Sequence, residues 1–137
     1  MPVDVAVLAH DERHLRRKVI ATEHGMALAF DLPQAMRLAD RDRLILSNGG
    51  QVEVIAAREE LTELRGRDAR HLIELAWHLG NRHLTAQVEE DRILIARDPV
   101  IGAMLEGLGA SLRDVREPFQ PVHGAYHGHD HGGSGDG

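Results

Sequence analysis

The sequence predicts an α+β protein, and three observations along the chain lead to that fold class. Apolar and polar residues alternate through much of residues 1–57, which indicates a small all-β domain. Two helical patterns set between strand patterns follow in residues 58–119, which indicates a mixed domain. Residues 120–137 are rich in Gly, His and Asp, which indicates a flexible histidine-rich tail.

Length and composition agree with this division. The 137 residues suit one ordinary domain or two small ones, and hydrophobic residues make up 42% of them, which is enough for a core. Only 3% of the residues are aromatic, so aliphatic side chains must fill that core.

The first domain reads as β structure over residues 3–56. VDVAVL at 3–8 alternates with a period of two, as a half-buried strand does. KVIATEHGMALAF at 18–30 predicts two short strands around His24-Gly25. DRLILSNGGQVEVIAA at 42–57 predicts a hairpin, because its central Asn and Gly residues tolerate positive φ between two apolar runs.

The second domain begins with EELTEL at 59–64, which suits a strand. RDARHLIELAWHLG at 67–80 then predicts a helix, with Asp68 as the N-cap and Gly80 as the stop. Its apolar residues at helical spacing are Leu72, Ile73, Leu75, Ala76 and Leu79.

Two further strands, a second helix and a last strand complete this domain. HLTAQVEEDRILIA at 83–96 predicts two strands that turn at Glu90-Asp91. DPVIGAMLEGLG at 98–109 predicts a helix that Asp98 caps, with Pro99 at its first position. The side chains expected on the buried side of that helix are Val100, Ile101, Met104, Leu105 and Leu108. ASLRDVREPF at 110–119 supplies the last strand.

The predicted order β-α-β-β-α-β is that of the ferredoxin-like fold, a four-stranded sheet with two helices on one face. RNA-recognition modules share this fold, but they stack bases on aromatic side chains of the sheet. The predicted strands of this domain carry no aromatic residue before Phe119, and the domain is not basic. RNA binding is therefore not expected.

Charge and hydropathy argue against a nucleic-acid-binding protein and against a membrane protein. A net charge of -6 argues against any nucleic-acid partner, and the short basic run RHLRRK at 13–18 reads as a solvated turn. No apolar run approaches the roughly 20 residues that span a bilayer, so no membrane partner is expected. The chain shows no N-terminal targeting signal and has no Cys, which predicts a cytoplasmic protein without thiolate metal sites.

Catalytic motifs are absent from the sequence. It contains no GxSxG, no Walker A loop, no HExxH and no Cys nucleophile. We therefore expect a protein that is not an enzyme.

Histidines of the tail point to metal binding instead. His127, His129 and His131 recur at every second residue, with His123 a little earlier. Neutral imidazole suits Zn, Cu, Ni and Fe, and Asp130 could add an oxygen ligand. The tail therefore predicts a loose chelator, and a solubilising or purification tail is the alternative interpretation.

Outside the tail, His83 is the next candidate ligand. LGNRH places it just past the predicted helix stop, in a turn where a side chain can be exposed on a rigid frame. A lone histidine there is usually a surface residue, but a two-fold axis would bring two copies together. For His10, His14, His24, His71 and His78 we expect ordinary structural or surface roles.

Several segments together resemble the UreE family of urease accessory proteins. They are AWHLGNRH at 76–83, RDPVIGAMLEGLGA at 97–110, EPFQPVHGAY at 117–126 and the trailing histidines. The N-terminal domain is similar as well, in DLP at 31–33 and LADRDRL at 38–44. The resemblance thus covers nearly the whole chain.

This resemblance implies a cytoplasmic nickel chaperone for urease assembly. It implies an N-terminal domain that contacts partner proteins, and a homodimer in which His83 of both protomers holds Ni(II). By the same resemblance, His127, His129 and His131, with His123, complete or feed the site. The implied partners are the urease accessory GTPase and the urease apoprotein complex. Because IARDPV at 95–100 contains no histidine, we expect no accessory site at that strand.

Two further interpretations stay open at this point. The chain could be a histidine-rich protein that buffers Ni or Zn without a client, or an interaction module whose histidines are incidental. Imidazole affinity rises from Co to Ni to Cu, so Cu(II) or Zn(II) could bind in place of Ni(II). Since imidazole ligands must be deprotonated, binding should weaken as the pH falls through about 6.5.

Overall fold

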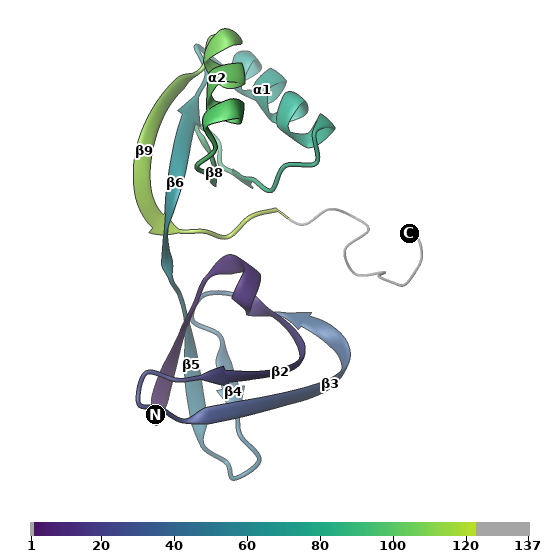
Figure 1. Cartoon of the computed structure of the whole chain (residues 1–137), viewed down its shortest axis with the longest axis vertical. Coiled ribbons are helices and arrows are strands. Elements are labelled where there is room, and N and C mark those ends of the chain that lie inside the picture. The colour runs from purple at the N-terminus through teal and green to yellow at the C-terminus, as the bar shows by residue number, and fades with distance from the viewer. Residues whose placement is uncertain (1, 123–137) are drawn as a thin grey trace. The chain divides into compact units, whose positions relative to one another are not determined.

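The computed structural model describes residues 2–122, and these form two compact units, residues 2–57 and 58–122 (Figure 1). Both units contain several strands, and the second also contains two α-helices. The predicted α+β class is therefore confirmed. Residues 123–137 of the predicted tail lie outside the described residues.

The first unit contains two sheets. Strands β1 (Asp4–Leu8), β5 (Gln51–Ala56) and β4 (Arg43–Ile45) form a three-stranded sheet, in which β1 runs parallel to β5. Strands β2 (His14–Ala21) and β3 (Ala27–Arg37) form an antiparallel pair. A short 3-10 helix, η1 (His10–Arg13), connects β1 to β2.

Both hairpins predicted in this unit are confirmed. β4 pairs with β5 antiparallel across a turn in which Gly49 has φ 86°. β2 pairs with β3 across a turn in which Gly25 has φ 84°, and β3 extends well beyond the expected Phe30. At both turns glycine occupies the left-handed backbone region that other residues disfavour.

The basic run at 13–18 is not the solvated turn that we expected. Most of it forms β2, because Leu15 and Ile20 of this strand are buried in the core. Arg13 is itself buried, and its guanidinium donates a hydrogen bond of 2.9 Å to the carbonyl of Leu8. The core around them consists of Ala6, Leu8, Leu15, Ile20, Leu28, Leu38, Val52 and Val54.

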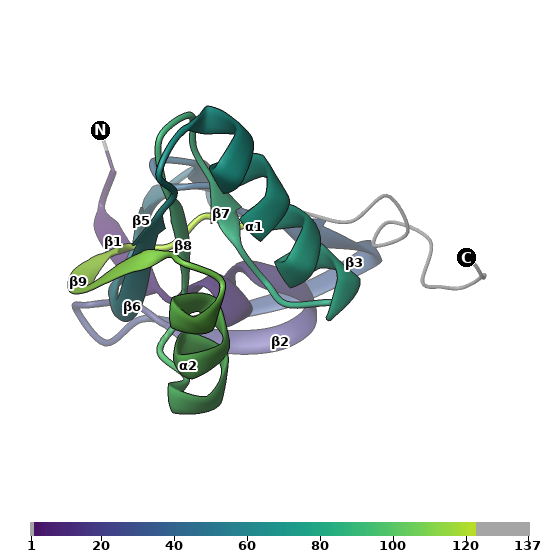
Figure 2. The same cartoon turned by 90° about the horizontal axis from the view of Figure 1, so that it is seen from above.

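The second unit is a single antiparallel sheet with both helices on one face (Figures 1 and 2). The sheet has the order β7-β8-β6-β9, from β7 (Gln87–Val88), β8 (Ile93–Ala96), β6 (Arg58–Arg65) and β9 (Ser111–Pro118). The helices are α1 (Ala69–Asn81) and α2 (Pro99–Gly107). Along the chain the elements follow the predicted β-α-β-β-α-β order.

Both predicted helix N-caps are confirmed. The Asp68 carboxylate accepts a hydrogen bond of 2.8 Å from the backbone N–H of His71. The Asp98 carboxylate accepts from the N–H groups of Val100 and Ile101, and Pro99 opens the helix. No helix within residues 2–122 is long and apolar enough to cross a membrane.

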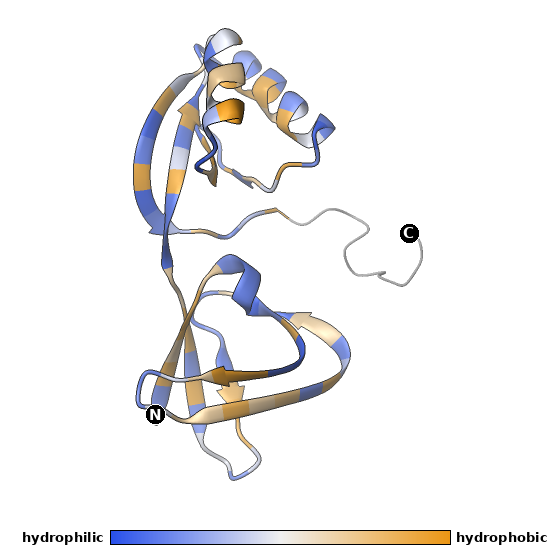
Figure 3. Ribbon diagram, in the orientation of Figure 1, coloured by the Kyte–Doolittle hydropathy of each residue, from blue (hydrophilic) through white to orange (hydrophobic). Residues whose placement is uncertain are grey.

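The core of this unit lies between the helices and the sheet. Its buried members are Leu64, Leu72, Leu75, Leu79, Ile93, Ile95 and Leu105. The prediction was wrong for two residues that it placed on the buried sides of the helices, since Ile73 is 69% exposed and Val100 is 76% exposed. At 3.6 residues per turn each lies about 90° or more around its helix from the centre of the buried stripe. Figure 3 shows apolar bands separated by polar stretches along β6 and β9.

Candidate metal centre

His83 is the one candidate ligand of the sequence analysis that falls within residues 2–122. It lies in the turn directly after α1, and its side chain is exposed, as expected. Its backbone has φ 58°, in the left-handed region. Its N–H donates to the carbonyl of Gly80 at 3.0 Å, and the N–H of Leu84 donates to that of Leu79 at 3.1 Å. This pair of bonds is a Schellman motif, with His83 at the position where a helix usually places glycine.

Helix α2 ends in the same motif and uses the expected residue. Gly109 has φ 90° and donates to the carbonyl of Glu106 at 2.9 Å, while Ala110 donates to that of Leu105 at 3.0 Å. The left-handed conformation costs a residue other than glycine roughly 1–2 kcal/mol. The imidazole of His83 therefore occupies a strained position that glycine would fill without strain, and strain of this kind is commonest at functional sites. The prediction that Gly80 ends this helix is wrong. Helix α1 includes Gly80, and His83 supplies the left-handed residue that follows the helix.

Contacts at both ends of α1 fix the helix that carries this turn. At the C-terminal end, Leu79 is buried in the core. At the N-terminal end, Nδ1 of His71 accepts from the N–H of Arg67 at 2.9 Å, so Nε2 carries the proton and donates to the carbonyl of Leu108 at 2.8 Å. This buried histidine links the start of α1 to the end of α2. The structural role expected for His71 is thus confirmed.

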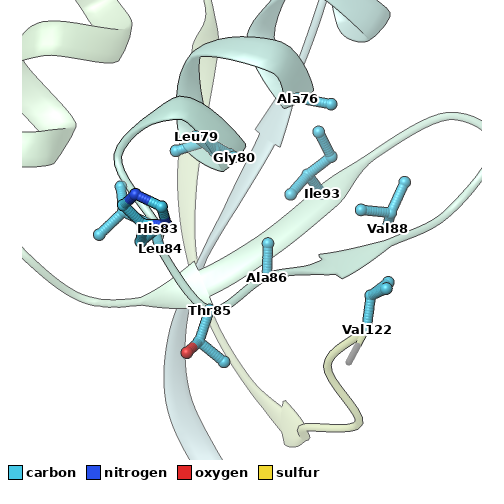
Figure 4. Close-up of a pocket in the computed structure, with 10 residues that line it drawn as sticks. All are labelled: Ala76, Leu79, Gly80, His83, Leu84, Thr85, Ala86, Val88, Ile93 and Val122. Carbon is cyan, nitrogen blue, oxygen red and sulfur yellow. The ribbon is translucent and has the colours of Figure 1, made fainter. Parts of the chain in front are cut away.

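A pocket of about 360 Å³ opens beside His83 (Figure 4). Helix α1, the segment after it and strands β7 and β8 supply most of its lining, which is largely apolar. The lining residues are Ala76, Leu79, Gly80, His83, Leu84, Thr85, Ala86, Val88, Ile93 and Val122. In Figure 4, His83 and Val122 lie at opposite sides of this pocket.

Val122 is held in place by its backbone. Its N–H donates to the carbonyl of Ala86 at 2.8 Å, and the N–H of Gln120 donates to Oε1 of Gln87 at 2.8 Å. The last described residues thus run beside the segment that leads into β7. The histidine-rich sequence follows directly from the rim of the pocket that His83 lines.

The four tail candidates, His123, His127, His129 and His131, lie outside the described residues. Within residues 2–122, no group of three or more His, Cys, Asp or Glu side chains is arranged to hold an ion. His83 therefore contributes one imidazole. An ion bound there needs further ligands from the tail or from a second chain.

An exposed apolar face on α1 was missed by the sequence analysis. Trp77 is 64% exposed and lies four residues after Ile73, so the two side chains share one face of the helix. The signal was available in the sequence, because these positions fall outside the stripe formed by Leu72, Leu75 and Leu79. Large exposed apolar side chains that cluster in this way commonly mark an interface.

Within residues 2–122, two buried carboxylates have shifted pKa values, and both belong to structural networks. Burial alone would raise the pKa of Asp4, but hydrogen bonds from the Thr22 hydroxyl and the N–H groups of Val5 and His24 outweigh it and lower the pKa. Burial also opposes ionisation of Glu63, and arginine hydrogen bonds again lower its pKa. Both groups are satisfied by protein partners.

Comparison with known proteins gives a consistent result over both units. Residues 2–57 match the family model described as UreE urease accessory protein, N-terminal domain. Residues 59–137 match the one described as UreE urease accessory protein, C-terminal domain.

Individual relatives carry the name urease accessory protein UreE. The chain is 58% identical to the one from Rhizobium meliloti over 96% of this chain and 85% of that protein. It is 58% identical to the one from Agrobacterium fabrum, over 93% of this chain and 80% of the relative. It is 61% identical to the one from Mesorhizobium japonicum over 91% of this chain, which spans 64% of that longer protein.

Proposed function

The chain belongs to the UreE urease accessory protein family, and from this premise we propose that it is a metallochaperone that delivers Ni(II) for assembly of the urease active site. The observation that supports this most is His83, an exposed imidazole held in a strained backbone conformation directly after α1. Neutral imidazole is a suitable ligand for Ni(II). No residue is assigned a catalytic role, and the proposal is a carrier rather than an enzyme.

The proposed ligands are His83 together with His127, His129, His131 and His123 of the tail. His83 alone binds an ion weakly, and the tail follows from the rim of the same pocket at Val122. Ligands that are few, neutral and partly on a tail allow an ion to be held and then passed on. Zn(II) and Cu(II) compete at such a site, so selectivity for nickel has to come from partners and supply.

A homodimer completes the proposal. Ile73 and Trp77 offer an apolar face on α1, and His83 lies in the turn that ends this helix. An isologous contact sets each residue near its own counterpart, so packing along α1 near its C-terminal end would bring two copies of His83 close together. Two imidazoles fixed in this way would form the centre that tail histidines complete.

We assign the parts of the chain as follows. Residues 1–57 form the partner-binding domain, and residues 58–119 form a ferredoxin-like domain for metal binding and dimerisation. The antiparallel strand order β7-β8-β6-β9 and the two helices on one face support the second assignment. The proposed partners are the urease accessory GTPase and the urease apoprotein complex, in the cytoplasm.

Urease maturation with purified components tests this function. Apo-urease, the accessory GTPase and limiting Ni(II) are mixed with the wild-type chain, with His83→Ala or with the matched control His78→Ala on the same helix. We expect the wild type and the control to raise urease activity and His83→Ala to raise it far less. Excess Ni(II) should remove the difference, because a carrier matters only when its cargo is scarce.

The same assay distinguishes a chaperone that delivers nickel from a protein that only stores it. A protein that only buffers nickel would lower urease activity at limiting Ni(II), because it withholds the ion, and would form no complex with the GTPase. Either result would reject the chaperone proposal.

A further inference from the structure

Most of the side chains that line the pocket beside His83 are apolar. Leu84, Ala86 and Ile93 contribute apolar side chains, and the polar side chains of the lining are those of His83 and Thr85 (Figure 4). The pocket has a volume of about 360 Å³, and covering its apolar side chains with another apolar group lowers the free energy of the chain in water. The question is which group does so.

The position at which the chain leaves the described residues indicates which group could cover the pocket. The backbone N–H of Val122 is bound to the carbonyl of Ala86, so the chain leaves the described residues from a fixed point on the rim. His83 lies at the other side of the pocket (Figure 4). The pocket therefore lies between His83 and the point from which the histidine-rich sequence continues.

The sequence beyond Val122 offers one large side chain with an apolar body, Tyr126. It is four residues past Val122, and an extended chain spans at most about 14 Å over four residues. This reach suits a pocket whose rim begins at Val122. A tyrosine ring suits such a place because its body is apolar while its hydroxyl can stay in water at the edge.

We propose that Tyr126 of the same chain packs into this pocket and anchors the tail beside His83. The proposed occupant is the segment of residues 124–127, whose one aromatic ring would cover the apolar lining. Because His127 is the next residue, the anchor keeps it close to His83. The benefit for nickel rests on the proposed function, whereas the packing of the ring does not.

The anchor acts by raising an effective concentration. A ligand on a short linker meets its site at about millimolar effective concentration, and an added contact along the linker raises that value further. Tyr126 therefore increases the nickel affinity of His127 and His83 without touching the ion. It acts as a positioning residue.

Nuclear magnetic resonance of the metal-free full-length chain tests the packing directly. Tyr126 is the only tyrosine, so its ring protons are unambiguous, and methyl-labelled Leu84, Ala86 and Ile93 report on the pocket. We expect Overhauser contacts between the ring and these methyl groups, lost in Tyr126→Ser and kept in the control His131→Ser. Absence of the contacts in the wild type would overturn the proposal.

Mixing ring-labelled and methyl-labelled chains identifies the occupant. Contacts between two different chains, or contacts from Trp77 of a second copy to the pocket methyl groups, would show that another chain covers the pocket and would overturn the proposal. Contacts that occur only within one chain support it.

Calorimetric titration with Ni(II) tests the consequence for the metal. We expect Tyr126→Ser to weaken binding roughly tenfold because the tail loses its anchor, and Tyr126→Phe to keep the wild-type affinity. Equal affinity of Tyr126→Ser and wild type would remove the positioning role. If the wild type bound no nickel at all, the proposed function would fail while the metal-free contacts would still decide the packing.

Discussion

At the residue scale, one position combines structural strain with a candidate ligand. His83 and Gly109 end the two helices of one domain-sized unit with the same pair of backbone hydrogen bonds. Glycine adopts this conformation freely, whereas histidine does not. The difference indicates that the imidazole, rather than the helix end, accounts for the residue at position 83.

This comparison predicts that stability and nickel binding oppose each other at position 83. His83→Gly should raise the free energy of unfolding of the metal-free chain by about 1 kcal/mol, because glycine relieves the left-handed strain. The same substitution should weaken Ni(II) binding. Urea unfolding followed by far-ultraviolet circular dichroism measures the first effect, and calorimetry measures the second.

The control is a substitution of Gly109, the corresponding residue at the end of α2. Gly109→Ala introduces the strain that His83→Gly removes, and its added Cβ would crowd the guanidinium of Arg67. It should therefore destabilise the chain and leave nickel affinity unchanged. A His83→Gly protein less stable than wild type would contradict the strain argument.

At the element scale, the face of the sheet away from the helices carries a charged network. The carboxylate of Glu63 on β6 accepts from Arg92 at 3.0 Å, from Arg113 at 3.1 Å and from Arg65 at 3.2 Å. Its side chain is only 4% exposed. Arg92 also donates to Glu117 at 2.8 Å. The network thus links β6, β9 and the start of β8.

Removing the central charge should destabilise this sheet. Glu63→Gln leaves three arginines with a poorer acceptor, and hydrogen bonds to charged groups contribute about 1.5–3 kcal/mol. We expect a loss of roughly 2 kcal/mol in the free energy of unfolding. The matched control Glu60→Gln, whose side chain is 69% exposed and paired with Arg97, should change it by less than about 1 kcal/mol. Equal losses in the two variants would contradict a special role for the buried network.

Acid should weaken the same network. Hydrogen bonds from arginines outweigh burial and hold the pKa of Glu63 below its usual value of 4.5, and Arg92 likewise lowers the pKa of Glu117. A lowered pKa in the folded state means that the stabilisation is complete above the usual value and is lost as the pH falls through the folded pKa. Thermal unfolding between about pH 7 and about pH 3 should show this loss for wild type and a smaller one for Glu63→Gln. A pH profile shared by both proteins would place the acid-sensitive groups elsewhere.

The elements themselves were largely predictable because their signals are local. Asp68 and Asp98 cap their helices through bonds to residues two or three positions away, and Gly25 and Gly49 mark both hairpins. The run at 13–18 was misread because its burial depends on strand partners distant in sequence. The same limit applied to Glu63, whose arginine partners lie up to 50 residues away.

The candidate site was predictable in part. His83 could be identified as an exposed turn residue after a helix, but its left-handed backbone follows from hydrogen bonds that only the structure shows. The pocket was not predictable either, since Val122 and Ala86 meet only through the fold.

At the scale of the whole molecule, the proposed dimer gives a direct prediction. Trp77→Ser removes the largest exposed apolar side chain of α1 and should convert the protein to monomers, so the mass in solution should fall from twice 15.1 kDa to 15.1 kDa. Val100→Ser, which changes a still more exposed residue on α2, should leave the mass unchanged. Sedimentation equilibrium measures both masses. A Trp77→Ser protein with the mass of the wild type would exclude this face as the interface.

The central claim is that the chain holds Ni(II) through the imidazole of His83. Crystals of the full-length protein loaded with Ni(II), measured at the nickel absorption edge, locate the ion without any assumption about its ligands. We predict an anomalous peak within bonding distance of a ring nitrogen of His83, with histidines of the tail completing the coordination. A bound nickel ion located elsewhere on the chain, with His83 free of metal, would contradict the claim.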